Sequence, residues 1–260
     1  MLQAPEIARF FHEWNQGELN SYLFEITVKV LSKLDPETGK PLVDLILDTA
    51  EQKGTGKWTS QNAFDLGVPI PTINAAVEMR MLSSLKDQRM KAASVLRGPA
   101  AAAGTASSIV NDVRDALHAS IITSYAQGMA LLSAASTEYQ YALKLDEIAS
   151  LWRGGCIIRS RMLTPIREAF ARTPAPANMM LDRYFADKLN ELQPAWHRAV
   201  ETAINQGIPV LATAASLGYY DACRRERLPA NLLQGQRDFF GAHTYRRTDR
   251  EGVFHTKWDE

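Results

Sequence analysis

The stretch "SSIVNDVRDALHASIITSYAQGMALLSAASTEY" (residues 107–139) repeats apolar residues at i, i+3, i+4 and i+7, which is the spacing of a helix. Its central part, Ala119–Thr137, contains no charged residue but includes Ser120, Thr123 and Gln127. That polarity suits a buried core helix better than a bilayer span. We therefore expect a long helix in the protein core.

The same pattern fills most of the 260 residues, so we predict an all-α fold. No run alternates polar and apolar residues over enough length to demand a strand. Helix ends are predicted at Gly39, Gly67, Gly98 and Gly207, each followed closely by proline. The other segments that we expect to be helical are 6–14, 19–34, 42–50, 72–96, 145–152, 162–170, 181–207 and 213–228.

Two similar offsets suggest an internal duplication. Gly67 and Gly207 each begin a Gly-x-Pro sequence before an apolar helix and lie 140 residues apart. Gly17 and Gly155 each follow a tryptophan and lie 138 residues apart. We favour two copies of one multi-helix unit, although Gly-x-Pro before a helix is also common punctuation.

The end of the chain differs from its body. From Leu233 onward, "LQGQRDFFGAHTYRRTDREGVFHTKWDE" loses its helical periodicity after about Phe240. We predict an all-α domain over residues 1–232 and a tail over 233–260. Because the tail is too small to form a core of its own, we expect it to pack on another surface, such as a second subunit.

Composition excludes several classes of function. The chain has 29 basic and 29 acidic residues, so no non-specific nucleic-acid or membrane surface is expected. No signal peptide is visible, and the two cysteines, Cys156 and Cys223, fall in apolar helical patterns. We expect buried thiols and a soluble protein in the reducing cytoplasm.

A glycine-rich stretch, "AEQKGTGKWTS" (residues 50–60), looks at first like a nucleotide phosphate loop. A P-loop requires G-x-x-x-x-G-K-[ST] after a strand. Counting back from Gly56 and Lys57, the first glycine position holds Glu51, and the Ser/Thr position holds Trp58. The nucleotide interpretation therefore fails on spacing.

Six motifs together resemble the decarboxylating 6-phosphogluconate dehydrogenases, over essentially the whole chain and in the same order. The resemblance implies the helical C-terminal domain of that family and NADP-dependent oxidation of 6-phosphogluconate, with loss of carbon dioxide to give ribulose 5-phosphate. It also implies a homodimer with tails exchanged between subunits. The motifs are "KGTGKWTSQNAFDLGVP", "LSSLKDQR", "ITSYAQGMALL", "WRGGCIIRS", "LPANLLQGQRDFFGAHTY" and "GVFHTKW".

Two parts of the family pattern are not found in the sequence. There is no G-x-G-x-x-G fingerprint after a strand, and no "K-x-x-H-N-x-x-E" pattern for the family's catalytic lysine and glutamate. We expect the dinucleotide-binding domain and the first helix of the helical domain to be missing. The 260-residue chain alone should then be inactive, with no catalytic residue of its own and no residue that distinguishes NADP from NAD. The alternative is a non-catalytic helical dimer derived from the same family.

The resemblance assigns substrate-binding roles to five residues. Lys53 and Thr55 match positions that contact the substrate phosphate, and Arg80 matches an arginine that clamps it. The alternatives are a solvated lysine at a helix end and a surface ion pair with Glu78, which stands where the family usually has an aromatic residue. Arg237 and His243 match tail residues that reach the substrate of the neighbouring subunit.

The remaining histidines carry no such motif. His12, His118 and His197 lie on expected helices and are interpreted as structural, and the role of His255 in the tail motif is open. No pair of histidines has the spacing of metal ligands, so we predict no metal site.

Overall fold

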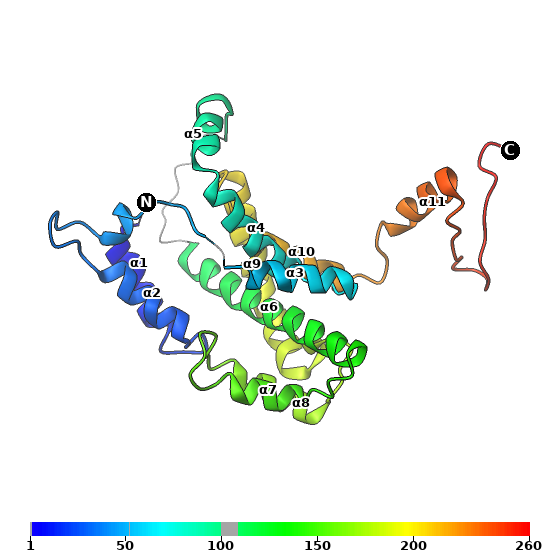
Figure 1. Cartoon of the computed structure of the whole chain (residues 1–260), viewed down its shortest axis with the longest axis horizontal. Helices are drawn as coiled ribbons and strands as arrows, with labels where there is room; N and C mark the ends of the chain where they lie inside the picture. Colours follow the sequence, from blue (N-terminus) through cyan, green and yellow to red (C-terminus); the bar gives the residue numbers. More distant parts are fainter. Residues whose placement is uncertain (1, 52, 100–108) are drawn as a thin grey trace. The chain divides into compact units, whose positions relative to one another are not determined.

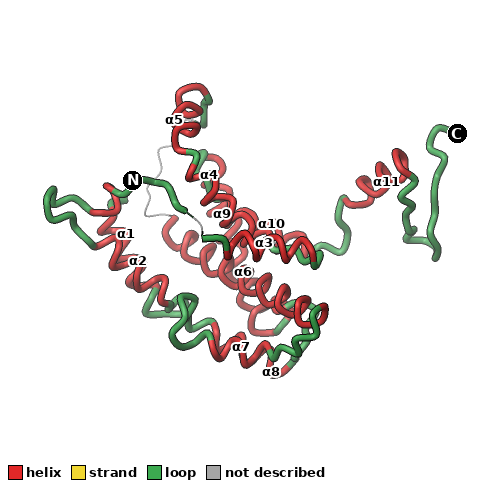
Figure 2. Tube along the Cα trace, in the orientation of Figure 1, coloured by secondary structure: helices red, strands yellow, loops and turns green. Residues whose placement is uncertain are grey.

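The computed structural model describes residues 2–51, 53–99 and 109–260. Over these residues the chain is built from helices and loops, and its only strand-like pairings are three isolated bridges (Figure 2). The all-α prediction is confirmed. The chain forms two compact units, Met1–Tyr219 and Tyr220–Glu260, whereas the sequence prediction placed the start of the tail at residue 233.

The helices follow one another with short connections (Figure 1). The first unit opens with α1 (Ala4–Trp14), α2 (Tyr22–Ser32), the 3-10 turn η1 (Leu42–Leu45), α3 (Thr55–Asp65), α4 (Pro71–Ser84) and α5 (Lys86–Val95). It continues with α6 (Val110–Glu138), α7 (Leu145–Leu151), α8 (Leu163–Arg172), the 3-10 turn η3 (Met179–Leu181), α9 (Arg183–Asn205) and α10 (Leu211–Cys223). The second unit contains the end of α10 and α11 (Ala230–Gly241).

The core of the first unit forms where α6 packs along α9. Small residues such as Ala119 and Ala126 on α6 are fully buried and allow the two helices to approach closely. Large side chains on α9, among them Phe185 and Trp196, fill the space between. The predicted core helix is therefore confirmed. None of the described helices is long and apolar enough to cross a membrane.

Helix boundaries support the internal duplication. α4 begins at Pro71 and α10 at Leu211, and α3 ends at Asp65 while α9 ends at Asn205, so both offsets are 140 residues. The turns between these helices also match, because Gly67 and Gly207 share a φ of 65°. At both turns the backbone N–H of the next residue donates to the carbonyl five residues earlier, at 2.8 Å. Both glycines thus end a helix, as the sequence predicted.

Several local predictions were wrong. Residues 42–50 form one 3-10 turn followed by a loop, because Asp48 turns outward to pair with Lys86 and Arg89. The expected helix over 72–96 breaks at Leu85. Helix α3 was not predicted, since Ala63 is its only buried residue and no apolar stripe marks it.

Two further expectations fail for local reasons. Gly39 lies in a turn after α2 has ended, and Gly98 lies beyond α5 without a positive φ, so neither glycine caps a helix. The thiols are not buried, because Cys156 falls in the loop after α7 and Cys223 lies at the end of α10 with an exposed side chain.

Candidate functional site

The start of α3 carries the features of an anion site. Gly54 is the N-cap residue and has a φ of 99°, a conformation that favours glycine. No side chain caps this helix, and its first intrahelical bond runs from Trp58 N–H to the Gly54 carbonyl. The backbone N–H groups of Thr55, Gly56 and Lys57 therefore lack an intrahelical acceptor. Such groups, together with the helix dipole, favour a phosphate.

Arg80 lies beside this helix start. A Cβ atom added to Gly56 would be 3.0 Å from Nη2 of Arg80 and 2.8 Å from Cγ2 of Val77. Val77 and Arg80 are one turn apart on α4, so this face of α4 rests directly on the first turn of α3. The absence of a side chain at Gly56 is what allows the guanidinium to come so close.

The cations near this helix start are not neutralised within the chain. Lys53, Lys57 and Arg80 are exposed, and none of them forms an ion pair with another described residue. The surface ion pair considered for Arg80 and Glu78 is not formed in the described part of the chain. The solvated-lysine alternative for Lys53 changes as well, because Lys53 precedes a helix start rather than following a helix end.

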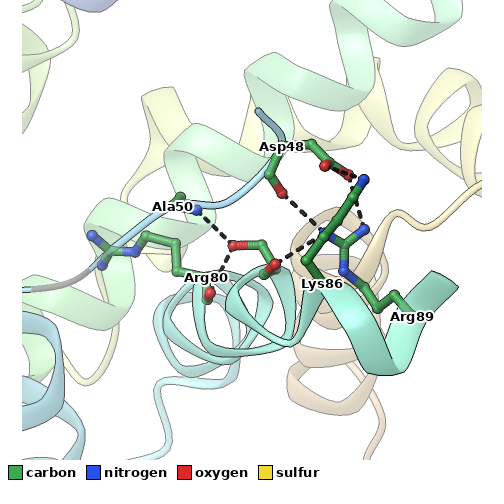
Figure 3. Close-up of polar contacts among 6 residues, drawn as sticks. Asp48, Ala50, Arg80, Lys86 and Arg89 are labelled. Carbon is green, nitrogen blue, oxygen red and sulfur yellow. Dashed lines mark hydrogen bonds and ion pairs between the residues drawn. The ribbon is translucent and has the colours of Figure 1, made fainter. Parts of the chain in front are cut away.

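A polar network lies behind Arg80 and was not anticipated from sequence. It joins the loop before α3 to the end of α4 and the start of α5 through Asp48, Ala50, Ser83, Lys86 and Arg89 (Figure 3). Figure 3 shows the Arg80 side chain extending away from this network, with only its backbone carbonyl engaged. A signal did exist, since Ser83, Lys86 and Arg89 all belong to the motif "LSSLKDQR".

The second compact unit carries Arg237 and His243. Arg237 is exposed on α11, where its Nη1 makes only a long contact of 3.5 Å with Gln234 Oε1. His243 follows the end of α11 and is also exposed, with its ring against the edge of Phe240. Both residues present unneutralised donors at the surface of this unit.

Asp238 organises this unit from its centre. Its buried carboxylate accepts hydrogen bonds from the backbone of Thr244 and Thr256, the ring of His255 and the indole of Trp258, at 2.9–3.0 Å. Burial alone raises the pKa of Asp238, but the hydrogen bonds outweigh it and lower the pKa to about 2. This explains the tail motif that contains His255: it wraps around a buried carboxylate.

No metal centre accompanies these sites. Among the described residues, no group of three or more histidine, cysteine, aspartate or glutamate side chains could hold a metal ion.

Comparison with known proteins identifies the family to which this geometry belongs. Residues 1–258 match the family model described as the 6-phosphogluconate dehydrogenase C-terminal domain. The chain belongs to this family. The resemblance noted in the sequence is therefore confirmed, and the helical architecture is that of the family's C-terminal domain.

Individual members of the 6-phosphogluconate dehydrogenase family are similar over the whole chain. The NADP(+)-dependent decarboxylating enzyme of Bacillus subtilis (strain 168) is 52% identical over 259 residues, which is 99% of this chain and 55% of that protein. The decarboxylating enzyme of Escherichia coli (strain K12) is 51% identical over 258 residues, again 99% and 55%. The chain thus spans about half the length of these relatives.

A solved structure shows the same fold. The 6-phosphogluconate dehydrogenase of Plasmodium falciparum matches with a TM-score of 0.93 and 42% identity, covering 99% of this chain and 56% of that one. That enzyme has been described in its apo form, with NADP+ and with 6-phosphogluconate.

Proposed function

We propose that this chain supplies the substrate-phosphate site and the subunit interface of a decarboxylating 6-phosphogluconate dehydrogenase. The observation that carries the proposal is the position of Arg80, whose guanidinium lies against Gly56 at the uncapped start of α3. Lys53 and Thr55 flank the same helix start. A phosphate placed there meets backbone donors, an ammonium group and a guanidinium fork at once.

The role of these residues is to bind and orient the substrate. Holding the phosphate at one end of 6-phosphogluconate fixes the sugar chain, so that its 3-hydroxyl and carboxylate are presented in one defined place. Oxidation at that hydroxyl creates a ketone β to the carboxylate, which is why carbon dioxide can then leave. NADP is the hydride acceptor in this chemistry, but the sequence lacks a dinucleotide fingerprint, and we assign no residue of the chain to the cofactor.

The proposal includes a homodimer in which the tail of one copy completes the site of the other. Arg237 and His243 provide the donors, and the helix that carries them has apolar side chains left exposed, with Phe240 at 71% and Leu232 at 67%. Exposed apolar surface of this kind marks an interface. The substrate is a small anionic metabolite, and we place the protein in the cytoplasm.

Calorimetric titration of the 260-residue chain tests the phosphate site. We expect 6-phosphogluconate to bind and gluconate, which lacks the phosphate, to bind much more weakly. Replacing Arg80 with alanine should weaken 6-phosphogluconate binding about tenfold or more, because a charge-assisted hydrogen bond contributes about 1.5–3 kcal/mol.

Arg97→Ala provides the control, because Arg97 is exposed on the same unit and forms no ion pair with a described residue. Equal binding of the phosphorylated and unphosphorylated sugars would contradict the phosphate site. A chain that dimerises but binds neither sugar would instead support a non-catalytic interaction protein.

A further inference from the structure

The loop before α3 occupies a stretch that is helical in the other half of the duplication. Under the 140-residue offset, α9 begins at the counterpart of Val43, whereas α3 begins only at Thr55. The counterpart of Thr55 is Ala195, which lies inside α9 and is buried. One half therefore has a continuous helix where the other has a loop and a new helix start. The free N–H groups of the phosphate site exist because the helix is interrupted there.

A loop that replaces helix must be held by other contacts, and Asp48 provides them. Its carboxylate contacts Lys86 Nζ at 2.5 Å and Arg89 Nη1 at 2.9 Å. Nη2 of Arg89 donates to the backbone carbonyl of Asp48 at 3.1 Å and to that of Ser83 at 2.9 Å. Arg89 thus joins the loop to the point where α4 ends, and the partly buried side chains of Lys86 and Arg89 place this cluster against the protein surface.

Ser83 makes the second connection, and it leads to Arg80. The backbone N–H of Ala50 donates to Ser83 Oγ at 2.9 Å, and Ser83 Oγ donates to the Arg80 carbonyl at 2.7 Å (Figure 3). Ala50 lies three residues before Lys53. One hydroxyl therefore joins the backbone of the loop that carries Lys53 to the backbone of the residue that carries the guanidinium.

We propose that Asp48, Ser83 and Arg89 are positioning residues of the phosphate site, which hold the Lys53 loop and Arg80 at a fixed separation. The inference rests on the proposed function and extends it to residues that do not touch the substrate. Without this network the loop has many conformations, and binding must order it each time. With it, the two cationic arms are already in place when the phosphate arrives.

Charge keeps the network intact over the working pH range. Hydrogen bonds from Arg89 and Lys86 hold the pKa of Asp48 well below its usual range. The carboxylate therefore stays ionised, and mild acid does not release the loop.

Titration of the full chain with 6-phosphogluconate and with gluconate tests the inference in the variants Asp48→Asn, Ser83→Ala and Arg89→Lys. We expect each to weaken 6-phosphogluconate binding by about fivefold or more and to leave gluconate binding unchanged. Arg89→Lys keeps the charge but loses the fork, so it remains informative if Asp48→Asn folds poorly. Asp187→Asn is the matched control, because it removes an exposed ion pair with Arg183 outside the site.

A double-variant cycle separates positioning from general stability. If Asp48 acts through the Lys53 loop, Asp48→Asn should add little to the loss already caused by Lys53→Ala. Additive losses, or equal weakening of both sugars, would overturn the inference while leaving the phosphate site intact. If Arg80→Ala itself has no effect on 6-phosphogluconate binding, the proposed function fails instead.

Discussion

Ser21 lies opposite Ser160 in an isolated antiparallel bridge, and the two residues are 139 positions apart. The bridge has two hydrogen bonds, from Tyr22 N–H to the Arg159 carbonyl at 2.9 Å and from Arg161 N–H to the Asn20 carbonyl at 2.8 Å. Adding 139 to the residues of the second bond's acceptor and the first bond's donor exchanges the two bonds. The pairing is thus unchanged when the two halves of the unit are exchanged, as it is at a two-fold axis.

This local symmetry explains why the phosphate site is notable. The two halves share helix ends, turns and a symmetric bridge, but only the first half interrupts its helix before residue 55. The site therefore arises from a departure from the repeat, at the point where Asp48 and Ser83 replace helical hydrogen bonds.

A buried polar cluster should contribute strongly to the stability of the first unit. Gln127 on α6 accepts from Thr72 N–H and donates to Thr72 Oγ1, which also bonds Ser216 Oγ on α10, at 2.9–3.0 Å. Gln127→Leu leaves the Thr72 N–H buried without an acceptor, so we expect a loss of about 1–3 kcal/mol in the free energy of unfolding. Urea denaturation measures it, with exposed Thr137→Ala on the same helix as control. An unchanged midpoint would show that the cluster is not intact.

Gly56→Ala should weaken phosphate binding although it improves helix propensity. Alanine favours a helix by about 1 kcal/mol over glycine. Here, however, its Cβ would lie 2.8 Å from the buried Val77 and 3.0 Å from Arg80. We expect a shift of the guanidinium and about a tenfold loss of 6-phosphogluconate affinity in calorimetry. Gly128→Ala is the control, since its Cβ would meet nothing within 4 Å. Affinity equal to that of the unaltered chain would place Arg80 elsewhere in solution.

The tail unit should lose its structure in acid through Asp238. Its folded pKa of about 2 lies below the ordinary 3.8, so the unfolded tail binds more protons in acid. The stabilisation is present above the ordinary pKa and is lost as the pH falls through about 2. We expect the indole N–H resonance of Trp258 to move over this range and Asp238→Asn to abolish the transition. Asp259→Asn, in the same tail, should leave it unchanged, and a transition that survives Asp238→Asn would assign it to another group.

The sequence predicted those parts of the fold that depend on local chemistry. The apolar stripes of α6 and α9 and the glycines that end α3 and α9 are readable without tertiary information. Helix α3 was missed because it buries almost nothing, and the break at Leu85 was missed because nothing in the local pattern interrupts residues 72–96. The network around Asp48 could not be predicted, since it joins polar residues 41 positions apart along the chain.

The last prediction concerns the tail, and it asks whether Arg237 acts on a second copy of the chain. We expect Arg80→Ala and Arg237→Ala to damage every site in their own homodimers, because each removes a charged donor from the same phosphate. When the two variants are unfolded together and refolded, each mixed dimer would hold one doubly damaged site and one intact site. Random pairing makes about half of the dimers mixed, so about a quarter of all sites should recover full affinity.

Recovery of a high-affinity class is a result that an arrangement within one chain cannot produce. If Arg237 served the site of its own copy, each site in a mixed dimer would still carry one damaged residue, and titration of the mixture would show weak sites alone. The control is a mixture of Arg80→Ala with Arg97→Ala, in which the sites of the second variant stay intact before and after refolding. Mixed dimers are verified by mass spectrometry of chains that differ in isotope label. Should they form without any high-affinity class, the tail of one copy does not complete the site of the other.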